Sequence, residues 1–363
     1  MVITGSFPPQ KCGVGDYTFS LTQELSGISD IKVGILTSAG QDPVSVSDGA
    51  EIFPIIKKWS FFEITKLIKF IRHWSPDIVH IQYPTQGYRQ RLLSDLLPLI
   101  CYLMGSKIVQ TWHEGYGWLR TPQFLMKALI PSTLIVVRPQ YREYLPPFMR
   151  WFLGRRKLQY IPNASSVPKA SLSYDERIEL RKQSLQGQKR LIVFFGFVYP
   201  KKGVTLIFDI ADPNSDHIVI AGQIDQAGAY RDEVLRRCTS EPWLGKVTIT
   251  GFISVESASR LLSVADAVIL PFRTGGGEWN TSIHSAALQG TFVLTTSQLK
   301  NGYDPLHNIY YSKIDDVLSM KGALNIYAGV KINNRIKIDD EWKKMAAEHY
   351  VIYKSILTRN FSK

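Results

Sequence analysis

The sequence predicts an α/β protein made of two doubly wound parallel-sheet domains in series. Short, apolar, β-branched runs alternate with helical patterns, which is typical of strand–helix–strand units. This alternation starts again after Asn163, and a Pro/Ser-rich stretch at residues 161–168 separates the halves as a hinge would. The length of 363 residues also fits about two domains. We therefore expect domains at residues 1–165 and 166–341, followed by a final helix at residues 342–363.

The predicted strands can be given in chain order. After a short initial strand, those of the first half are residues 31–36, 78–81, 108–111 and 134–137. Those of the second half are residues 191–195, 217–221, 247–249, 267–270 and 292–294. Ligands of such sheets bind beyond the carboxyl ends of the strands, so two sheets facing each other would enclose an interdomain cleft.

Composition limits the function classes. The net charge of +12 favours anionic partners, such as nucleotide phosphates, nucleic acid or an acidic membrane. No RNP, zinc or helix-turn-helix pattern supports nucleic-acid binding. Cys12, Cys101 and Cys238 are scattered, so we expect neither disulfides nor a metal site. The apolar stretch at residues 92–109 is interrupted by charges, so we expect a buried helix followed by a strand there and no membrane span. The first residues lack a signal-peptide pattern, so we expect a cytoplasmic protein.

A glycine-rich loop in the second half is the strongest candidate for an anion site. An apolar strand runs into Gly275, Gly276 and Gly277, and a helix is predicted at residues 281–289 with a hydroxyl cap. Glycines let the backbone approach a ligand, and the start of a helix attracts negative charge. The candidate binding residues here are Gly276, Gly277, Glu278, Asn280, Thr281 and Ser282. The alternative is a flexible surface loop before an ordinary helix.

Three further segments carry candidate residues. Gly13 and Gly15 follow the first strand where a phosphate-cradling loop would lie, but the spacing is not that of a nicotinamide dinucleotide site. Lys202 precedes a glycine in a strand–turn–helix segment and could reach a phosphate, or could be an ordinary exposed lysine. His113 follows a strand and could donate a hydrogen bond to a sugar, act as an acid/base, or be structural. Lys202 and His113 are the candidate catalytic residues.

The order of these motifs resembles the retaining glycosyltransferase family 4, of GT-B architecture, over nearly the whole chain. The motifs are Pro-Pro-x-x-x-Gly-x-Gly from Pro8, Thr-x-His-Glu from Thr111, Ile-Pro-Asn from Ile161, Phe-Gly-x-x-x-Pro-x-Lys-Gly from Phe195, and Ala-Asp-x-x-x-x-Pro-Phe from Ala265, followed by the glycine loop. Their order is more specific than any one of them.

The resemblance implies a nucleotide-sugar donor held mainly by the second domain and an acceptor held mainly by the first. It places Gly13 and Gly15 beside the donor diphosphate, His113 near the donor sugar, Lys202 on the diphosphate, and the backbone amides of Thr281 and Ser282 on phosphate oxygens. We expect a UDP-sugar rather than a GDP-sugar, and no resident cofactor. The final helix, from about Trp342, would return to brace the first domain.

Two departures separate this chain from the usual family pattern. Phe197 stands where an arginine is common, and Gly277 and Ser285 stand where paired glutamates are common. Glu278 could replace the first glutamate by a shift of one residue. The chain resembles a sub-branch with a Gly/Ser-type phosphate loop. A transferase of polysaccharide or glycoconjugate synthesis is the leading hypothesis, and an inactive nucleotide-sugar-binding partner of another transferase is the alternative.

Two basic, aromatic segments are candidates for contact with an anionic membrane beside a lipid-linked acceptor. Residues 60–74 predict a helix with a Ser60/Glu63 capping box and one apolar face, formed by Phe61, Ile64, Leu67, Ile68, Ile71 and Trp74. Residues 146–157 are the second segment. Such segments can rest on a bilayer surface, or an amphipathic helix can simply cover a core.

Overall fold

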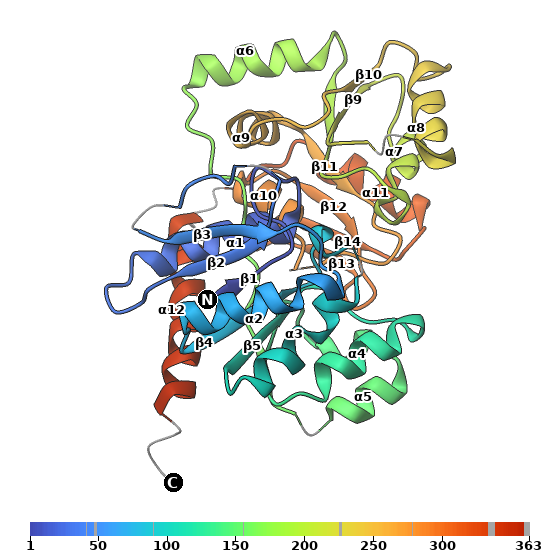
Figure 1. Ribbon diagram of the computed structural model, residues 1–363. Coiled ribbons are helices and arrows are strands. Elements are labelled where there is room, and N and C mark those ends of the chain that lie inside the picture. Colours follow the sequence, from blue (N-terminus) through green and yellow to red (C-terminus); the bar gives the residue numbers. More distant parts are fainter. Residues whose placement is uncertain are drawn as a thin grey trace. The chain divides into compact units, whose positions relative to one another are not determined.

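The computed structural model describes residues 1–40, 42–46, 49–89, 91–154, 156–224, 227–277, 279–332 and 338–358 (Figure 1). Its contacts divide the chain into two units, Met1–Asn163 with Trp342–Lys363, and Ala164–Glu341. The first boundary lies two residues before the one expected from the sequence. Among the described helices, none combines the length and apolar character that a membrane span requires.

The first unit contains a seven-stranded parallel sheet in the order β3-β2-β1-β4-β5-β6-β7. Its strands are β1 (Val2–Ile3), β2 (Gly34–Ser38), β3 (Glu51–Ile56), β4 (Ile78–Tyr83), β5 (Lys107–Trp112), β6 (Thr133–Val136) and β7 (Leu158–Tyr160). Every residue of β4 is buried, as expected of a central strand covered on both faces. The strand order reverses between β1 and β4, where doubly wound folds bind their ligands.

Helices cover this sheet, and the last one comes from the other end of the chain. They are α1 (Gly13–Ser26), α2 (Ile64–Trp74), α3 (Leu92–Leu103), α4 (Thr121–Ala128), α5 (Pro147–Leu153) and α12 (Ile338–Thr358). The buried helix and strand expected over residues 92–109 are confirmed by α3 and β5. In Figure 1, α12 is the red helix, and the ring of Trp342 lies 5.6 Å from that of Tyr17 on α1.

One detail of the predicted helix at residues 60–74 is wrong. A 3-10 turn, η1 (Phe61–Glu63), precedes α2, and the side chain of Ser60 caps neither element. Leu67 and Ile71 are buried, whereas Phe61 is 54% exposed because it lies in the 3-10 turn, outside the α-helical repeat that faces the core. This segment is mainly a core helix.

The second unit contains a sheet in the order β10-β9-β8-β11-β12-β14-β13, parallel except for β13. Its strands are β8 (Arg190–Phe195), β9 (Asp216–Ala221), β10 (Val247–Ile249), β11 (Ala267–Leu270), β12 (Val293–Thr296), β13 (Gly302–Asp304) and β14 (Ile309–Ser312). Its helices are α6 (Tyr174–Leu185), α7 (Ile207–Ile210), α8 (Ala229–Thr239), α9 (Val255–Val264), α10 (Thr281–Leu288) and α11 (Val317–Tyr327). All nine of the strands predicted by residue range from the sequence are present.

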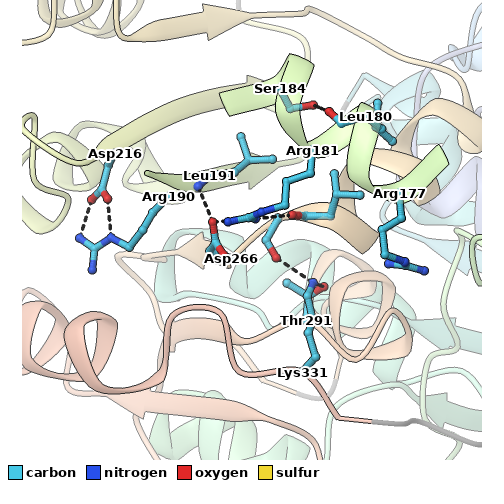
Figure 2. Close-up of polar contacts among 12 residues, drawn as sticks. Arg177, Leu180, Arg181, Ser184, Arg190, Leu191, Asp216, Asp266, Thr291 and Lys331 are labelled. Atoms are coloured by element: carbon cyan, nitrogen blue, oxygen red, sulfur yellow. Dashed lines mark hydrogen bonds and ion pairs between the residues drawn. The ribbon is translucent and has the colours of Figure 1, made fainter. Parts of the chain in front are cut away.

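The amino edge of this second sheet is tied together by charged groups (Figure 2). Asp266 accepts a hydrogen bond from the backbone N–H of Leu191 at 2.6 Å and pairs with Arg181 at 2.9 Å. Arg190 pairs with the buried Asp216. These contacts satisfy buried charges where β8, β9 and β11 begin, so this edge has a structural role. Ligands of such sheets bind at the opposite, carboxyl edge.

Candidate functional site

The glycine-rich loop of the second unit is fixed to the sheet at its carboxyl edge. The backbone N–H of Gly276 donates to the carbonyl of Thr296 at 2.7 Å, and the hydroxyl of Thr296 donates to the carbonyl of Phe272 at 2.5 Å. A Cβ atom on Gly276 would lie 2.5 Å from the ring of Phe272, and one on Gly277 would lie 2.3 Å from the ring of Trp279. The loop is therefore packed against the sheet at Gly276, where the buried Phe272 leaves no room for a side chain.

The start of α10 differs from the expected hydroxyl cap. Its N-cap residue is Asn280, and Thr281 and Ser282 are its first two helical residues. The side chain of Asn280 does not cap the helix; it accepts a hydrogen bond from the N–H of Gly277 at 3.1 Å. The first N–H groups of a helix have no partner within it, so those of Thr281 and Ser282 suit an anion. The predicted binding residue Glu278 lies outside the described residues.

Lys202 lies beside this loop. The segment after β8 forms two 3-10 turns, η5 (Pro200–Lys202) and η6 (Val204–Leu206), before α7, so Lys202 does not directly open an α-helix as expected. The ammonium nitrogen of Lys202 lies 4.4 Å from the ring centroid of Phe272. The N–H of Arg273 donates to the carbonyl of Lys201 at 2.9 Å. The structure thus brings the predicted lysine and the predicted loop together.

The turn after β8 completes this group of segments. A Cβ atom on Gly196 would lie 3.1 Å from the hydroxyl oxygen of Ser282, so the turn lies against the start of α10. Because β8 and β11 are neighbours in the sheet, their carboxyl ends bring the turn, Lys202, the glycine loop and α10 to one place. We call this group the second-unit anion site. One lysine, a helix start and close-packed glycines make it suitable for a phosphate-containing ligand.

Gly203 is expected to be essential for this arrangement. Its φ is +66°, and a Cβ atom there would lie 2.1 Å from the carbonyl oxygen of Pro271. We expect Gly203→Ala to lower the free energy of unfolding by about 3 kcal/mol, of which roughly 1–2 kcal/mol is the cost of a left-handed alanine. Urea unfolding measures the loss. Gly245→Ala is the matched control, because φ is +76° there and the added Cβ would meet nothing within 4 Å. Equal losses of unfolding free energy in Gly203→Ala and Gly245→Ala would show that the close approach of Gly203 to Pro271 is unimportant.

Gly13 and Gly15 lie in a helix, not in the loop that the sequence predicted for them. Both lie in the first turn of α1, which begins directly after Cys12, rather than in a phosphate-cradling loop. Gly13 is exposed, with open space around its Cβ position. A Cβ atom on Gly15 would lie 3.0 Å from the carbonyl oxygen of Ser6. Gly15 therefore allows the start of α1 to pack against the segment after β1.

His113 follows β5 and is 7% exposed. Its Nε2 atom lies 2.8 Å from Oε1 of Gln82, and its ring stands edge-on to that of Tyr17, with centroids 4.6 Å apart. Burial, together with the nearby His349 and Arg138, lowers the pKa of His113 to about 3. The imidazole is therefore neutral near pH 7, which suits a hydrogen-bonding role and excludes a resting imidazolium acid.

The first unit also contains a cavity of about 60 Å³ beyond the ends of β4 and β5. A buried ion pair, Lys127 with Asp95 at 2.5 Å, lies in its wall. Oε1 of Gln123 is buried and has no hydrogen-bond partner among the described residues. The remaining lining residues are Tyr83, Pro84, Thr85, Tyr88, Ser94, Glu114, Gly115, Tyr116 and Arg120. The sequence analysis did not predict this cavity. The signal that could have indicated it was Asp95, a charged residue within an otherwise apolar run.

Comparisons with known proteins agree with the arrangement of strands. Residues 15–131 match a family model described as glycosyl transferase 4-like. The whole chain is similar to sucrose-phosphate synthase from Thermosynechococcus elongatus, with a TM-score of 0.72 and 14% identity over 99% of this chain and 98% of that one. The fold is GT-B. A search of curated protein sequences gives no significant match.

Two other GT-B structures were solved with nucleotides. Anabaena HepE in complex with UDP and glucose has a TM-score of 0.69 and 13% identity, over 99% of this chain and 98% of that one. The catalytic domain of starch synthase IV from Arabidopsis thaliana, bound to ADP and acarbose, has a TM-score of 0.67 and 13% identity, over 100% and 99%. The family model matches within the first unit, and these structures share the GT-B fold over the whole chain.

Proposed function

We propose that this protein transfers a sugar, with retention of configuration, from a nucleotide diphosphate sugar to a glycan or lipid-linked acceptor. The second-unit anion site carries the proposal, because it joins Lys202, a fixed glycine loop and the uncapped start of α10 at the carboxyl edge of a parallel sheet. We expect a UDP-sugar rather than a GDP-sugar. HepE, which shares the fold, was solved with UDP-glucose.

Charge stabilisation explains how such a site would act. As the bond to the anomeric carbon breaks, negative charge builds up on the leaving diphosphate. Lys202 and the N–H groups of Thr281 and Ser282 would stabilise that charge. We propose that no metal ion takes part, since a lysine and a helix start can supply the positive potential. Among the described residues, no group of three or more His, Cys, Asp or Glu side chains could hold a metal ion.

Isothermal titration with UDP, GDP and ADP tests the proposed function. We expect micromolar binding of UDP that is lost in Lys202→Ala. If no nucleotide binds to protein whose folding has been verified, the proposed donor site is wrong. Where one nucleotide binds, its sugar conjugates are then assayed for hydrolysis and for transfer to candidate acceptors.

The alternative function is that of an inactive nucleotide-sugar-binding partner of another transferase, and one observation favours it. Ser285, at the position of the second expected glutamate, is fully buried, and its hydroxyl lies 3.2 Å from that of Ser165. A side chain held there cannot supply a carboxylate to a ribose. Nucleotide binding without turnover of any donor, by protein that also binds acceptor, would favour this alternative.

We further propose that the first unit holds the acceptor, with acceptor hydroxyl groups in the cavity beside Asp95 and Lys127. Its wall combines tyrosine rings with charged groups, a mixture suited to a hydroxyl-rich ligand. The nearby helix α5 exposes Phe148 and Trp151, which are 40% and 77% exposed. We propose that this helix rests on the anionic, cytoplasmic face of a membrane beside a lipid-linked acceptor.

Co-sedimentation with phospholipid vesicles tests the membrane contact. We expect binding to vesicles rich in phosphatidylglycerol, weaker binding to pure phosphatidylcholine, and a several-fold loss in Trp151→Ala, because the indole would insert at the interface. Tyr174→Ala is the control, since Tyr174 lies on α6 of the other unit and is equally exposed, at 77%. Vesicle binding that does not depend on anionic lipid would contradict the proposal, as would an equal loss of binding in both variants.

A further inference from the structure

A buried polar chain lies behind His113 within the first unit. Gln82 on β4 stands between two histidines: its Oε1 lies 2.8 Å from Nε2 of His113, and its Nε2 lies 3.3 Å from Nε2 of His80. His80 continues the chain, with Nε2 2.7 Å from the hydroxyl of Thr111 and Nδ1 2.6 Å from the hydroxyl of Tyr353. Gln82 and Thr111 have no exposed surface, and His80 is 1% exposed.

The sheet register brings these groups together. His80 and Gln82 are alternate residues of β4, so their side chains lie on one face, and Gln82 pairs with Thr111 on β5. His113 follows two residues after Thr111 and lies on the same face. The carboxyl-terminal helix covers this face, because Tyr353 reaches His80, and the ring of His349 lies 5.6 Å from that of His80.

The buried amide determines where the protons lie. Its oxygen can only accept and its nitrogen can only donate. Oε1 of Gln82 faces His113, so Nε2 of His113 carries the proton. The amide nitrogen faces His80, whose Nε2 is therefore unprotonated. The single lone pair of this Nε2 is shared by the hydroxyl of Thr111 at 2.7 Å and the amide N–H at 3.3 Å, while Nδ1–H of His80 donates to Tyr353.

Burial keeps both imidazoles neutral, since it lowers the pKa of His80 well below its usual value and that of His113 to about 3. Each ring then carries a single proton. If the amide of Gln82 were rotated by 180°, both histidines would have to change tautomer together, with protons on Nε2 of His80 and Nδ1 of His113. The two histidines are thus coupled through Gln82.

We propose that Gln82 is a positioning residue that holds the proton of His113 on Nε2, so that Nδ1 is left to accept a hydrogen bond from a sugar hydroxyl of the substrate. This inference rests on the proposed function for the identity of the substrate. It reverses the expectation that His113 donates to the sugar. It also gives α12 a part in positioning, because the hydroxyl oxygen of Tyr353 accepts a hydrogen bond from Nδ1–H of His80.

Nitrogen-15 NMR of histidine side chains tests the tautomer without any substrate. The resonances of His80 and His113 are assigned from His80→Asn and His113→Asn variants. We expect His113 as the Nε2–H tautomer and His80 as the Nδ1–H tautomer in the intact protein. An Nδ1–H tautomer for His113 would overturn the proposal, whether or not the protein binds a nucleotide sugar.

Binding of UDP and UDP-glucose to variants tests the positioning role. Gln82→Met keeps the side-chain length and removes both hydrogen bonds, so we expect the affinity for UDP-glucose to fall about tenfold while the affinity for UDP is unchanged. Gln110→Met is the matched control. Gln110 is also fully buried, with hydrogen bonds to Ser132, Trp112 and the carbonyl of Lys127, but it has no contact with His113.

A conservative variant guards against simple misfolding. Glutamate in Gln82→Glu still accepts from Nε2 of His113, so we expect recovery of UDP-glucose affinity relative to Gln82→Met and an unchanged tautomer of His113. The carboxylate would raise the pKa of His113 against the opposing effects of His349 and Arg138. The other facing groups are the neutral Tyr17 and His80, whose Nε2 would take a proton to donate to the carboxylate. UDP-glucose binding should therefore weaken at acid pH in this variant alone. Equal affinity ratios in Gln82→Met, Gln110→Met and the unaltered protein would overturn the proposal. Failure of UDP itself to bind would instead count against the proposed function.

Discussion

Lys202→Ala is expected to lower the turnover of the nucleotide-sugar donor about 10²–10³-fold, which is the usual cost of removing one charge-stabilising donor. The lysine lies 4.4 Å from the ring of Phe272, beside the glycine loop, and no other cation has been assigned to the leaving diphosphate. Affinity for UDP should fall in parallel, because the product carries the same diphosphate. Steady-state donor hydrolysis, together with titration of UDP, measures both effects.

Lys201→Ala is the matched control for this prediction. Lys201 is exposed, and its backbone carbonyl, which the variant keeps, is the atom that accepts from Arg273. We expect turnover within about twofold of the unaltered protein, as for an ordinary surface substitution. Near-normal turnover in Lys202→Ala would remove the lysine from the mechanism. Equal losses in both variants would point to a general effect of positive charge on the capture of an anionic substrate.

The central strands were predictable because they are buried on both faces and read as continuous apolar runs. The strands that escaped prediction lie toward the edges of the sheets. β3 is an edge strand that contains Pro54, β7 and β13 have only three residues each, and β14 has four and lies between β12 and the edge strand β13. Such segments become strands because they pair with a neighbouring strand, and the local sequence pattern does not reveal that pairing.

Helix starts were less predictable, for a related reason. Two glycines in the first turn of α1 disfavour a helix by propensity, but the close contact of Gly15 with the carbonyl of Ser6 decides the local structure. At α10, the side chain of Asn280 bonds to Gly277 instead of capping the helix. Both outcomes depend on contacts between segments. Residue types alone therefore predicted a loop at Gly13 and Gly15 and a hydroxyl cap on α10, and both predictions were wrong.

The candidate site was partly predictable. Lys202 and the glycine loop follow neighbouring strands, so the rule that carboxyl ends meet at one edge brings them together from sequence alone. The partners of His113 could not be found this way. Gln82 and His80 read only as polar residues within a buried strand, and Tyr353 is 273 positions from His80 along the chain. Only the return of α12 to the first unit reveals that contact.

The same histidines lead to a second large effect, which is loss of stability of the first unit in acid. Burial lowers the pKa of His113 to about 3 and that of His349 to about 4, and His80 is shifted in the same direction. In the unfolded chain a histidine has a pKa of about 6.5. Below about pH 6.5 the unfolded chain therefore binds protons that the folded unit does not, so stability falls as pH falls, down to the folded pKa values.

Three histidines together would lower the free energy of unfolding by up to about 4 kcal/mol for each pH unit, at about 1.4 kcal/mol each. Urea unfolding between pH 7 and pH 5 should show stability falling with pH, most steeply below about pH 6.5, with the first unit unfolding first. His349→Phe removes one of these titrating groups, so its slope should be smaller. His73→Gln, at an exposed position on α2, should leave the slope unchanged. A stability that does not vary over this range would mean that the three imidazoles are protonated, or open to water, in the folded protein. The positioning of the His113 proton by Gln82 requires neutral imidazoles, so that result would remove the physical basis of that proposal as well.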